Sequence, residues 1–274
     1  MKISAHDQNT LEHLNKARTA HPDLETLFRF YEQLFKIQFA FKARLREDRH
    51  MGYLEDKEID LAYLASGVPQ VSLDELRIEA APFIDLYRNI VTLLIRDMGY
   101  LPPDSDETRQ ETILAQAREI FNGKGPLVGA GERADVIRIA SGLVLAPYLQ
   151  LACEYLMPRI TQSAWHRGHC PVCGGVPSFA LVHAEPGFRT LLCSRCDGEW
   201  RFRRMGCPFC LERDHQTYYP SEKGGYRLYV CEACHRYLKS LDLQESASER
   251  CLPVETLVTV SMDVAARGKG WLFF

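Results

Sequence analysis

The chain has 274 residues, of which 46% are hydrophobic, 25% charged and 10% aromatic. This composition is typical of a globular protein and excludes a disordered chain, a collagen and a coiled coil. The formal net charge is −3, whereas general nucleic-acid and membrane-surface binders usually carry a basic excess, so either role would need a local basic patch. The length suits one large domain or two smaller ones.

The first residues, MKISAHDQNTLEHL, contain neither an apolar run nor a small-residue cleavage site, so the sequence predicts no secretory signal and a cytoplasmic protein. In a reducing compartment, paired cysteines are more often metal ligands or redox groups than structural disulfides.

Residues 1–165 carry a helical pattern and one cysteine, Cys153. Apolar residues recur at spacings of three and four between His21 and Glu47, which predicts a long amphipathic helix. Ser72 and Glu75 form an S-x-x-E capping box, which predicts that the next helix begins near Leu76. We expect an all-helical domain whose remaining helices are Leu76 to Met98, Glu107 to Phe121, and Glu132 to Tyr155 with a bend at Pro147.

The longest apolar stretch runs from Gly142 to Met157 and contains Pro147, Gln150 and Glu154. It is too short and too polar to span a bilayer, and we interpret it as a buried helix. The glycine-rich segment Asn122 to Gly131 lacks the G-K-[ST] ending of a phosphate-binding loop, and no apolar strand precedes it, so we expect an interhelical loop.

From His166 to Lys239 the chain changes to short strands, turns and four C-x-x-C pairs. The interval between the first pair and the second nearly equals that between the third and the fourth, and both lie within the range of a four-thiolate zinc or iron site. The pairs are Cys170 with Cys173, Cys193 with Cys196, Cys207 with Cys210, and Cys231 with Cys234.

An internal repeat predicts which pairs share a metal. The first and third pairs both read C-P-x-C, and the second and fourth both follow a Gly-aromatic-Arg triplet. The third pair follows the first at almost the same distance along the chain as the fourth follows the second, so the segment is a tandem duplication. Each copy should bind its own ion, the first pair with the second and the third with the fourth. Disulfides are the alternative, and a thioredoxin-type redox motif would need a βαβ context that this pattern lacks.

Four cysteines complete a tetrahedral shell, which argues against hydrolytic metal catalysis and leaves a structural or electron-carrying role. Each copy has only about forty residues, too few for a core of its own, so metal loss should unfold it. The ligands do not separate zinc from iron. Residues 166–239 carry eleven Arg and Lys against seven Asp and Glu, and this excess can compensate the negative metal–thiolate sites.

Other residues of this half receive structural interpretations. Alternation from Glu199 to Met205 places Trp200 on the buried face of a strand. We expect Cys153 and Cys251 to be buried, inert thiols. With eight cysteines available as ligands, we expect the neighbouring histidines to be exposed: His169, His183, His215 and His235. No catalytic group stands out.

These motifs carry a resemblance. C-P-V-C-G-G-V-P from Cys170, C-S-R-C-D-G-E-W-R-F-R-R from Cys193, C-P-F-C from Cys207 and C-E-A-C-H-R-Y-L-K from Cys231 resemble the formate dehydrogenase accessory protein family FdhE. The resemblance implies a helical domain followed by two rubredoxin-like metal modules, with iron associated with the cysteines. It implies a cytoplasmic factor that contacts the catalytic subunit of respiratory formate dehydrogenase. The family's four pairs carry over to Cys170, Cys173, Cys193, Cys196, Cys207, Cys210, Cys231 and Cys234.

The chain departs from the rubredoxin pattern at one position. In rubredoxin knuckles, the residue after the second cysteine is often glycine. It is Gly174 after the first pair but Leu211 after the third, which weakens an electron-transfer role for the second site. The predicted organisation is a helical domain at 1–165, a first four-cysteine module at 166–204, and a second at 205–274 whose tail packs back on a module.

The predicted function is therefore a maturation factor, not an enzyme, with two ions of iron or zinc. Two other classes remain open. A zinc-ribbon protein that binds nucleic acid would place Arg201, Arg203 and Arg204 on phosphates and would lose affinity steeply with salt. A rubredoxin-like electron-transfer protein would need iron in at least one site.

Overall fold

The computed structural model describes residues 2–123, 132–183, 187–221, 224–243 and 250–273. The chain forms two compact units: residues 1–56 with 71–152, and residues 57–70 with 153–274. The predicted glycine-rich loop lies largely outside the described residues. The predicted domain boundaries at 165 and 204 remain a prediction.

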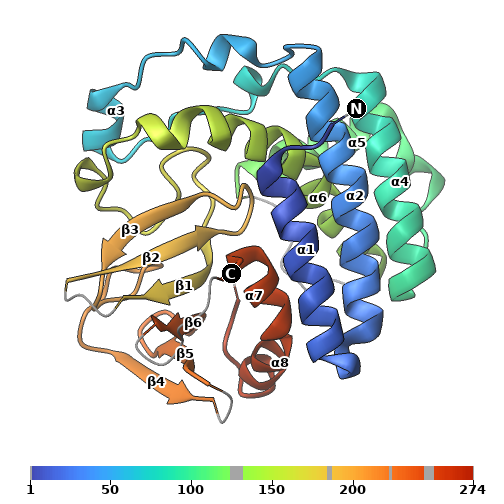
Figure 1. The fold of residues 1–274 in the computed structure, drawn as a ribbon. Coiled ribbons are helices and arrows are strands. Elements are labelled where there is room, and N and C mark those ends of the chain that lie inside the picture. Colours follow the sequence, from blue (N-terminus) through green and yellow to red (C-terminus); the bar gives the residue numbers. More distant parts are fainter. Residues whose placement is uncertain (1, 124–131, 184–186, 222–223, 244–249, 274) are drawn as a thin grey trace. The chain divides into compact units, whose positions relative to one another are not determined.

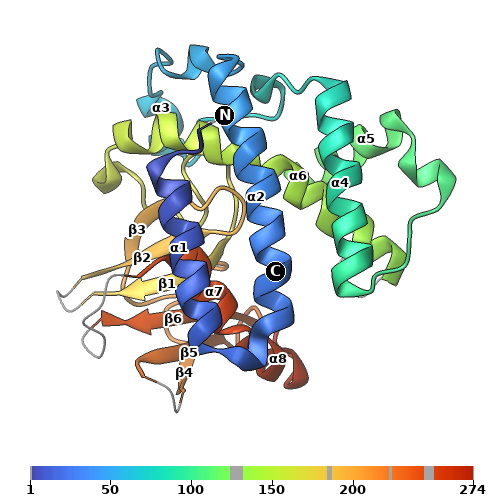
Figure 2. The ribbon, with the colours of Figure 1, turned by 45° about the vertical axis from the view of Figure 1, so that its right-hand side comes forward.

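The first unit is helical. In it α2 lies between α1 and α4, and α5 adjoins α4 (Figures 1 and 2). Large side chains such as Phe28, Phe83 and Tyr148 are fully buried in its core. Its helices are α1 (Ala5–Ala20), α2 (Glu25–Glu47), α4 (Ala80–Met98), α5 (Gln110–Phe121) and α6 (Glu132–Leu156), whose last residues belong to the second unit.

Helix α2 confirms the amphipathic helix predicted between His21 and Glu47, but it begins at Glu25. The preceding helix α1 was not predicted, because its apolar residues are few: only Asp7, Thr10 and Leu14 are buried along its 16 residues. A buried ion pair joins the two helices, with Lys42 Nζ 2.6 Å from Asp7 Oδ1.

The predicted start of α4 at Leu76 was wrong. The Ser72 amide does donate to Glu75 Oε2 at 2.8 Å, but Glu75 belongs to a separate 3₁₀ turn, Asp74–Leu76. Arg77 then takes a left-handed conformation with φ of 47°, which no helix continues. The α-helix begins only at Ala80.

Helix α6 contains the apolar stretch and the proline that the sequence indicated. By length and composition, residues Asp135–Arg159 would suffice to cross a membrane, but 72% of the apolar window is buried inside the protein. This burial agrees with the predicted core helix.

The second unit contains one six-stranded sheet, in the order β3-β2-β1-β6-β5-β4 (Figure 1). Each copy of the repeat forms a three-stranded antiparallel meander, and the two meanders join where β1 pairs with β6 in parallel. The predicted tandem of two similar modules is therefore confirmed, and the copies share a continuous sheet. The strands are β1 (Pro177–Val182), β2 (Phe188–Cys193), β3 (Glu199–Arg203), β4 (Gln216–Pro220), β5 (Tyr226–Cys231) and β6 (Arg236–Asp242).

Two C-terminal helices, α7 (Leu252–Val258) and α8 (Val260–Gly268), pack on this sheet. Leu252 of α7 packs with residues of both copies, among them Phe179 of β1 and Leu241 of β6. Ala266 of α8 packs against β5 and β6 of the second copy. The tail therefore covers both modules, whereas the sequence predicted contact with one.

The second unit also includes residues 57–70, which contain the short helix α3 (Leu61–Ser66). The Gln70 amide donates to the Pro171 carbonyl at 2.9 Å, within the first cysteine turn. The ring of His169 contacts the Gly67 carbonyl at 3.0 Å. A segment far ahead of the repeat in the chain thus supports its first turn, and no pattern in the sequence marks this contact.

Candidate metal centres

The structure brings the eight predicted cysteines together in two clusters. Within each cluster all four Sγ atoms lie within 4.8 Å of one another. The first cluster is Cys170, Cys173, Cys193 and Cys196, and the second is Cys207, Cys210, Cys231 and Cys234. Pairs one and two share a cluster, as do pairs three and four, which is the arrangement that the repeat predicted.

The sulfur spacing fits a tetrahedral metal. With metal–sulfur bonds of about 2.3 Å, a regular tetrahedron separates its sulfurs by about 3.8 Å. Cys173 Sγ lies 3.5 Å from the sulfurs of both Cys193 and Cys196, and Cys207 Sγ lies 3.6 Å from that of Cys234. A disulfide would require about 2.05 Å. All ten cysteines lie within the described ranges and none of them forms a disulfide there, so the disulfide alternative finds no support.

Each cysteine pair is presented by a tight turn. The amide of Gly174 donates to the Cys170 carbonyl at 3.0 Å, and Leu211 repeats this bond to Cys207 at the same distance. The residue after the second cysteine is left-handed in all four turns: Gly174, Asp197, Leu211 and His235, with φ of 72°, 54°, 67° and 56°. The backbone geometry at Leu211 therefore matches that at Gly174, despite the departure from glycine.

The two clusters differ in burial. The four cysteines of the first are all buried, whereas Cys210 of the second is exposed and Cys234 is half-buried. Burial raises the pKa of the Cys170 and Cys207 thiols, and it raises that of Cys234 to about 11. Hydrogen bonding with Cys170, Cys193 and Cys196 lowers the pKa of Cys173. A divalent cation entering either cluster must therefore displace protons from buried sulfur.

A fifth cysteine lies beside the first cluster. The Cys153 side chain is within hydrogen-bonding reach of the Cys196 sulfur. A Cβ atom at Gly198 would lie 2.5 Å from Cys153 Sγ and 3.2 Å from Cys196 Sγ, so glycine is required there. Cys153 is buried, as predicted, but its place at the cluster is new. It lies on helix α6, well ahead of the first pair, and so gave no spacing signal. Cys251, at the start of α7, is buried as predicted.

The histidines are not part of either four-cysteine group in the described chain. His215 and His235 are exposed, as predicted. The prediction was wrong for the other two, which are partly buried because each hydrogen-bonds: His169 with the Gly67 carbonyl and His183 with Thr190 Oγ1 at 2.8 Å. Trp200 is buried, as predicted, and its Nε1 donates to the Arg167 carbonyl at 3.1 Å.

The arginines that a nucleic-acid binder would use are engaged within the protein. Arg203 donates through Nη2 to the Leu211 carbonyl, and Arg204 donates through Nη1 to the His183 carbonyl at 2.7 Å. The guanidinium carbon of Arg201 lies 3.7 Å from the centre of the Phe188 ring. These contacts favour a structural role over phosphate binding.

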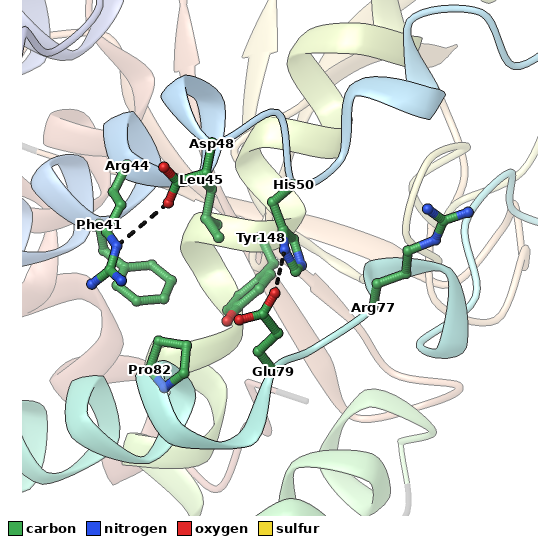
Figure 3. A pocket seen from close by; sticks show the side chains of 9 residues that line it. All are labelled: Phe41, Arg44, Leu45, Asp48, His50, Arg77, Glu79, Pro82 and Tyr148. Carbon is green, nitrogen blue, oxygen red and sulfur yellow. Dashed lines mark ion pairs between the residues drawn. The ribbon is translucent and has the colours of Figure 1, made fainter.

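A pocket of about 370 Å³ in the helical unit was not predicted (Figure 3). Among its lining residues, His50 Nδ1 lies 3.4 Å from Glu79 Oε1, and Arg44 Nε lies 3.5 Å from Asp48 Oδ2. The Tyr148 hydroxyl is buried without a hydrogen-bond partner among the described residues, and burial raises its pKa. The lining contains two arginines and two carboxylates, so its charge does not favour a ligand of either sign.

Comparison with known proteins agrees with the cysteine pattern. Residues 169–204, which contain the first cluster, match the family model described as the FdhE central domain. A protein FdhE homolog of Aquifex aeolicus is 25% identical over 226 residues, which cover 80% of this chain and 76% of the relative. A homolog of Yersinia enterocolitica is 26% identical over 229 residues, covering 79% of this chain and 71% of the relative.

A solved structure shares the fold. The crystal structure of the FdhE protein from Pseudomonas aeruginosa superposes with a TM-score of 0.62 at 23% identity, covering 99% of this chain and 95% of that one. The likeness thus extends through the helical unit, where the sequence offered no motif to match. The resemblance to the FdhE family predicted from the four cysteine pairs is confirmed.

Proposed function

We propose that this protein is a cytoplasmic accessory factor for the maturation of respiratory formate dehydrogenase, that it binds the catalytic subunit of that enzyme, and that it is not itself an enzyme. The observation that carries the proposal is the pair of four-cysteine clusters in the FdhE pattern. The similarity to FdhE homologs over about four fifths of the chain supports it.

Each cluster holds one metal ion, iron or zinc, and all eight cysteines are ligands. The donor set supports this assignment, because four thiolates at 3.5–3.6 Å along the measured edges suit a tetrahedral ion. Such an ion has no open position for water or substrate, which supports a structural role over hydrolysis. The metals fix the turns and the sheet edges between them, and so shape the surface that the partner contacts.

The test uses a bacterium whose own FdhE function has been deleted and which is grown anaerobically with nitrate. The chain is supplied as wild type, as Cys193→Ser with Cys231→Ser, or as the control Cys251→Ser, which lies outside both clusters. We expect wild type and control to restore formate oxidation and to co-purify with the catalytic subunit, while the double variant does neither. Normal formate dehydrogenase activity with the double variant, at matched protein levels, would refute the proposal.

One observation favours a second candidate, electron transfer at the second centre. Cys210 is exposed and Cys234 is half-buried, so a bound iron would lie near the surface. Purified protein should then show thiolate-to-iron absorption under oxidising conditions. A colourless, zinc-only protein that still restores formate oxidation would eliminate this candidate and leave the accessory role.

A further inference from the structure

Arg189 of β2 is a charged side chain with no exposed surface. Its Nη2 donates to the Gly206 carbonyl at 2.6 Å, but Nε and Nη1 have no hydrogen-bond partner in the described parts of the chain. Phe202 and Tyr229 flank it, each ring centre 5.6 Å from the guanidinium carbon. Burial lowers its pKa to about 10, so the group stays protonated at neutral pH. An isolated buried cation is costly and needs a countercharge.

In the second copy of the repeat, the equivalent arginine has a carboxylate partner. Arg227 occupies the equivalent place on β5, in the matching Gly-aromatic-Arg triplet, and pairs with Asp242 at 2.9 Å. The residue equivalent to Asp242 in the first copy is Arg204. The first copy therefore carries a cation where the second copy carries its carboxylate. No ion pair of Arg189 with a carboxylate occurs among the residues that the structure describes.

Arg189 adjoins the second cysteine cluster through Gly206. Gly206, which accepts its hydrogen bond, directly precedes Cys207, and negative charge on the Cys207 sulfur favours the charged guanidinium. Arg203 contacts the same turn, since its Nη2 donates to the Leu211 carbonyl and its Nε also lacks a partner among the described residues. Two arginines of the first copy thus hold the first knuckle of the second.

Four thiolates exceed a divalent ion by two negative charges, and in a buried setting their attraction to a nearby cation is strong. We propose that Arg189 is the buried countercharge of the second four-cysteine centre and stabilises its metal-loaded form. This inference rests on the proposed metal binding by Cys207, Cys210, Cys231 and Cys234. It makes metal retention in the second copy depend on a side chain of the first.

The test measures zinc release from the full-length, zinc-loaded protein to a colorimetric chelator. Because Cys210 is exposed, the second centre should release its zinc first, and Cys210→Ser identifies that phase by abolishing it. We expect Arg189→Met and Arg189→Gln to weaken zinc at the second centre about 10- to 100-fold, as loss of an outer partner of metal ligands does. Arg189→Lys keeps the charge and should recover most of the zinc affinity of the second centre. The slower zinc release from the first centre should be the same in all variants.

The matched control removes the equivalent pair of the second copy, Arg227→Met with Asp242→Asn. This deletes an arginine together with its own carboxylate and should leave zinc affinity at the second centre unchanged. Far-UV circular dichroism checks that each variant is folded.

Three results would overturn the proposal. Arg189→Met and Arg189→Gln could release zinc from the second centre as wild type does. Arg189→Lys could lose as much zinc affinity at the second centre as the neutral variants, which would show that the shape of the arginine matters and its charge does not. Wild-type protein that binds no zinc or iron at the second centre would overturn the proposed metal function as well, and so differs from the first two results.

Discussion

The four cysteine turns all require a left-handed backbone at the same position, and the residues found there differ in how easily they adopt it. The position after the second cysteine is left-handed in every turn, and glycine adopts this conformation without steric cost, whereas other residues incur it. Gly174 fits, while Asp197, Leu211 and His235 are strained to different degrees. The sequence showed where glycine was absent, but only the structure shows that the conformation was kept.

Leu211→Gly should stabilise the second centre. Leu211 is 43% exposed, so little packing is lost, and relief of the left-handed strain should raise the free energy of unfolding by about 0.5–1 kcal/mol. Thermal denaturation of the zinc-loaded protein measures this change. The opposite substitution, Gly174→Ala, is the control and should destabilise, because its Cβ would lie 3.0 Å from Pro69 Cγ. A lower melting temperature for Leu211→Gly would contradict the account.

Gly198→Ala should disrupt the first centre, since the new Cβ would lie 2.5 Å from Cys153 Sγ. We expect the bound metal to fall from two ions to one per chain, by elemental analysis of purified protein. The double variant with Cys153→Ala removes the clashing sulfur and should recover part of the lost metal. If Gly198→Ala alone retains both ions, the close packing of Cys153 on this centre is not required.

At the level of the elements, apolar periodicity predicted those helices that bury an apolar face. Helix α2 was found because apolar side chains line one face. Helix α4 was found with its start misplaced, because Ser72 and Glu75 bond to each other at a separate 3₁₀ turn. Helix α1 was missed because polar groups make its principal buried contact. Asp7 and Lys42 lie on different helices, and such a partner cannot be read from local periodicity.

The buried pair between α1 and α2 gives a test at this level. Both side chains are at most 2% exposed, so Asp7→Ala leaves the Lys42 charge without its carboxylate and should destabilise the protein by about 3–5 kcal/mol. The double variant Asp7→Leu with Lys42→Met replaces the pair with apolar groups and should lose much less. Denaturant unfolding followed by far-UV circular dichroism compares them. Equal losses in the single and double variants would show that the pair acts through shape.

For the whole molecule, the cysteine spacing was sufficient to predict the two clusters and their pairing, because both depend on local turns. The cysteine spacing could not predict that the two copies share one sheet. The contact of β1 with β6 is parallel and non-local, and several registers would satisfy strands buried along most of their length. The support from residues 57–70 was equally invisible, since it rests on backbone bonds such as Gln70 to Pro171.

Metal removal should affect the two compact units differently. All three tryptophans, Trp165, Trp200 and Trp271, belong to the second unit, and the first two are 1% exposed. A chelator strong enough to empty both centres should shift tryptophan fluorescence to the red, because the cysteine turns lose their cross-link. Circular dichroism should retain most of its helical signal, since most of the helices lie in the first unit. Parallel loss of both signals would show that the units unfold together.

The parallel pairing of β1 with β6 also has a consequence for biosynthesis. Strand β1 is complete at residue 182, but its neighbour β6 begins only at residue 236. At translation speeds of about 5–20 residues per second, the nascent first copy waits roughly 3–10 s with one backbone edge unpaired. During that interval the emerging chain is open to aggregation, and early capture of an ion by the first copy would protect its turns while the ribosome finishes the second.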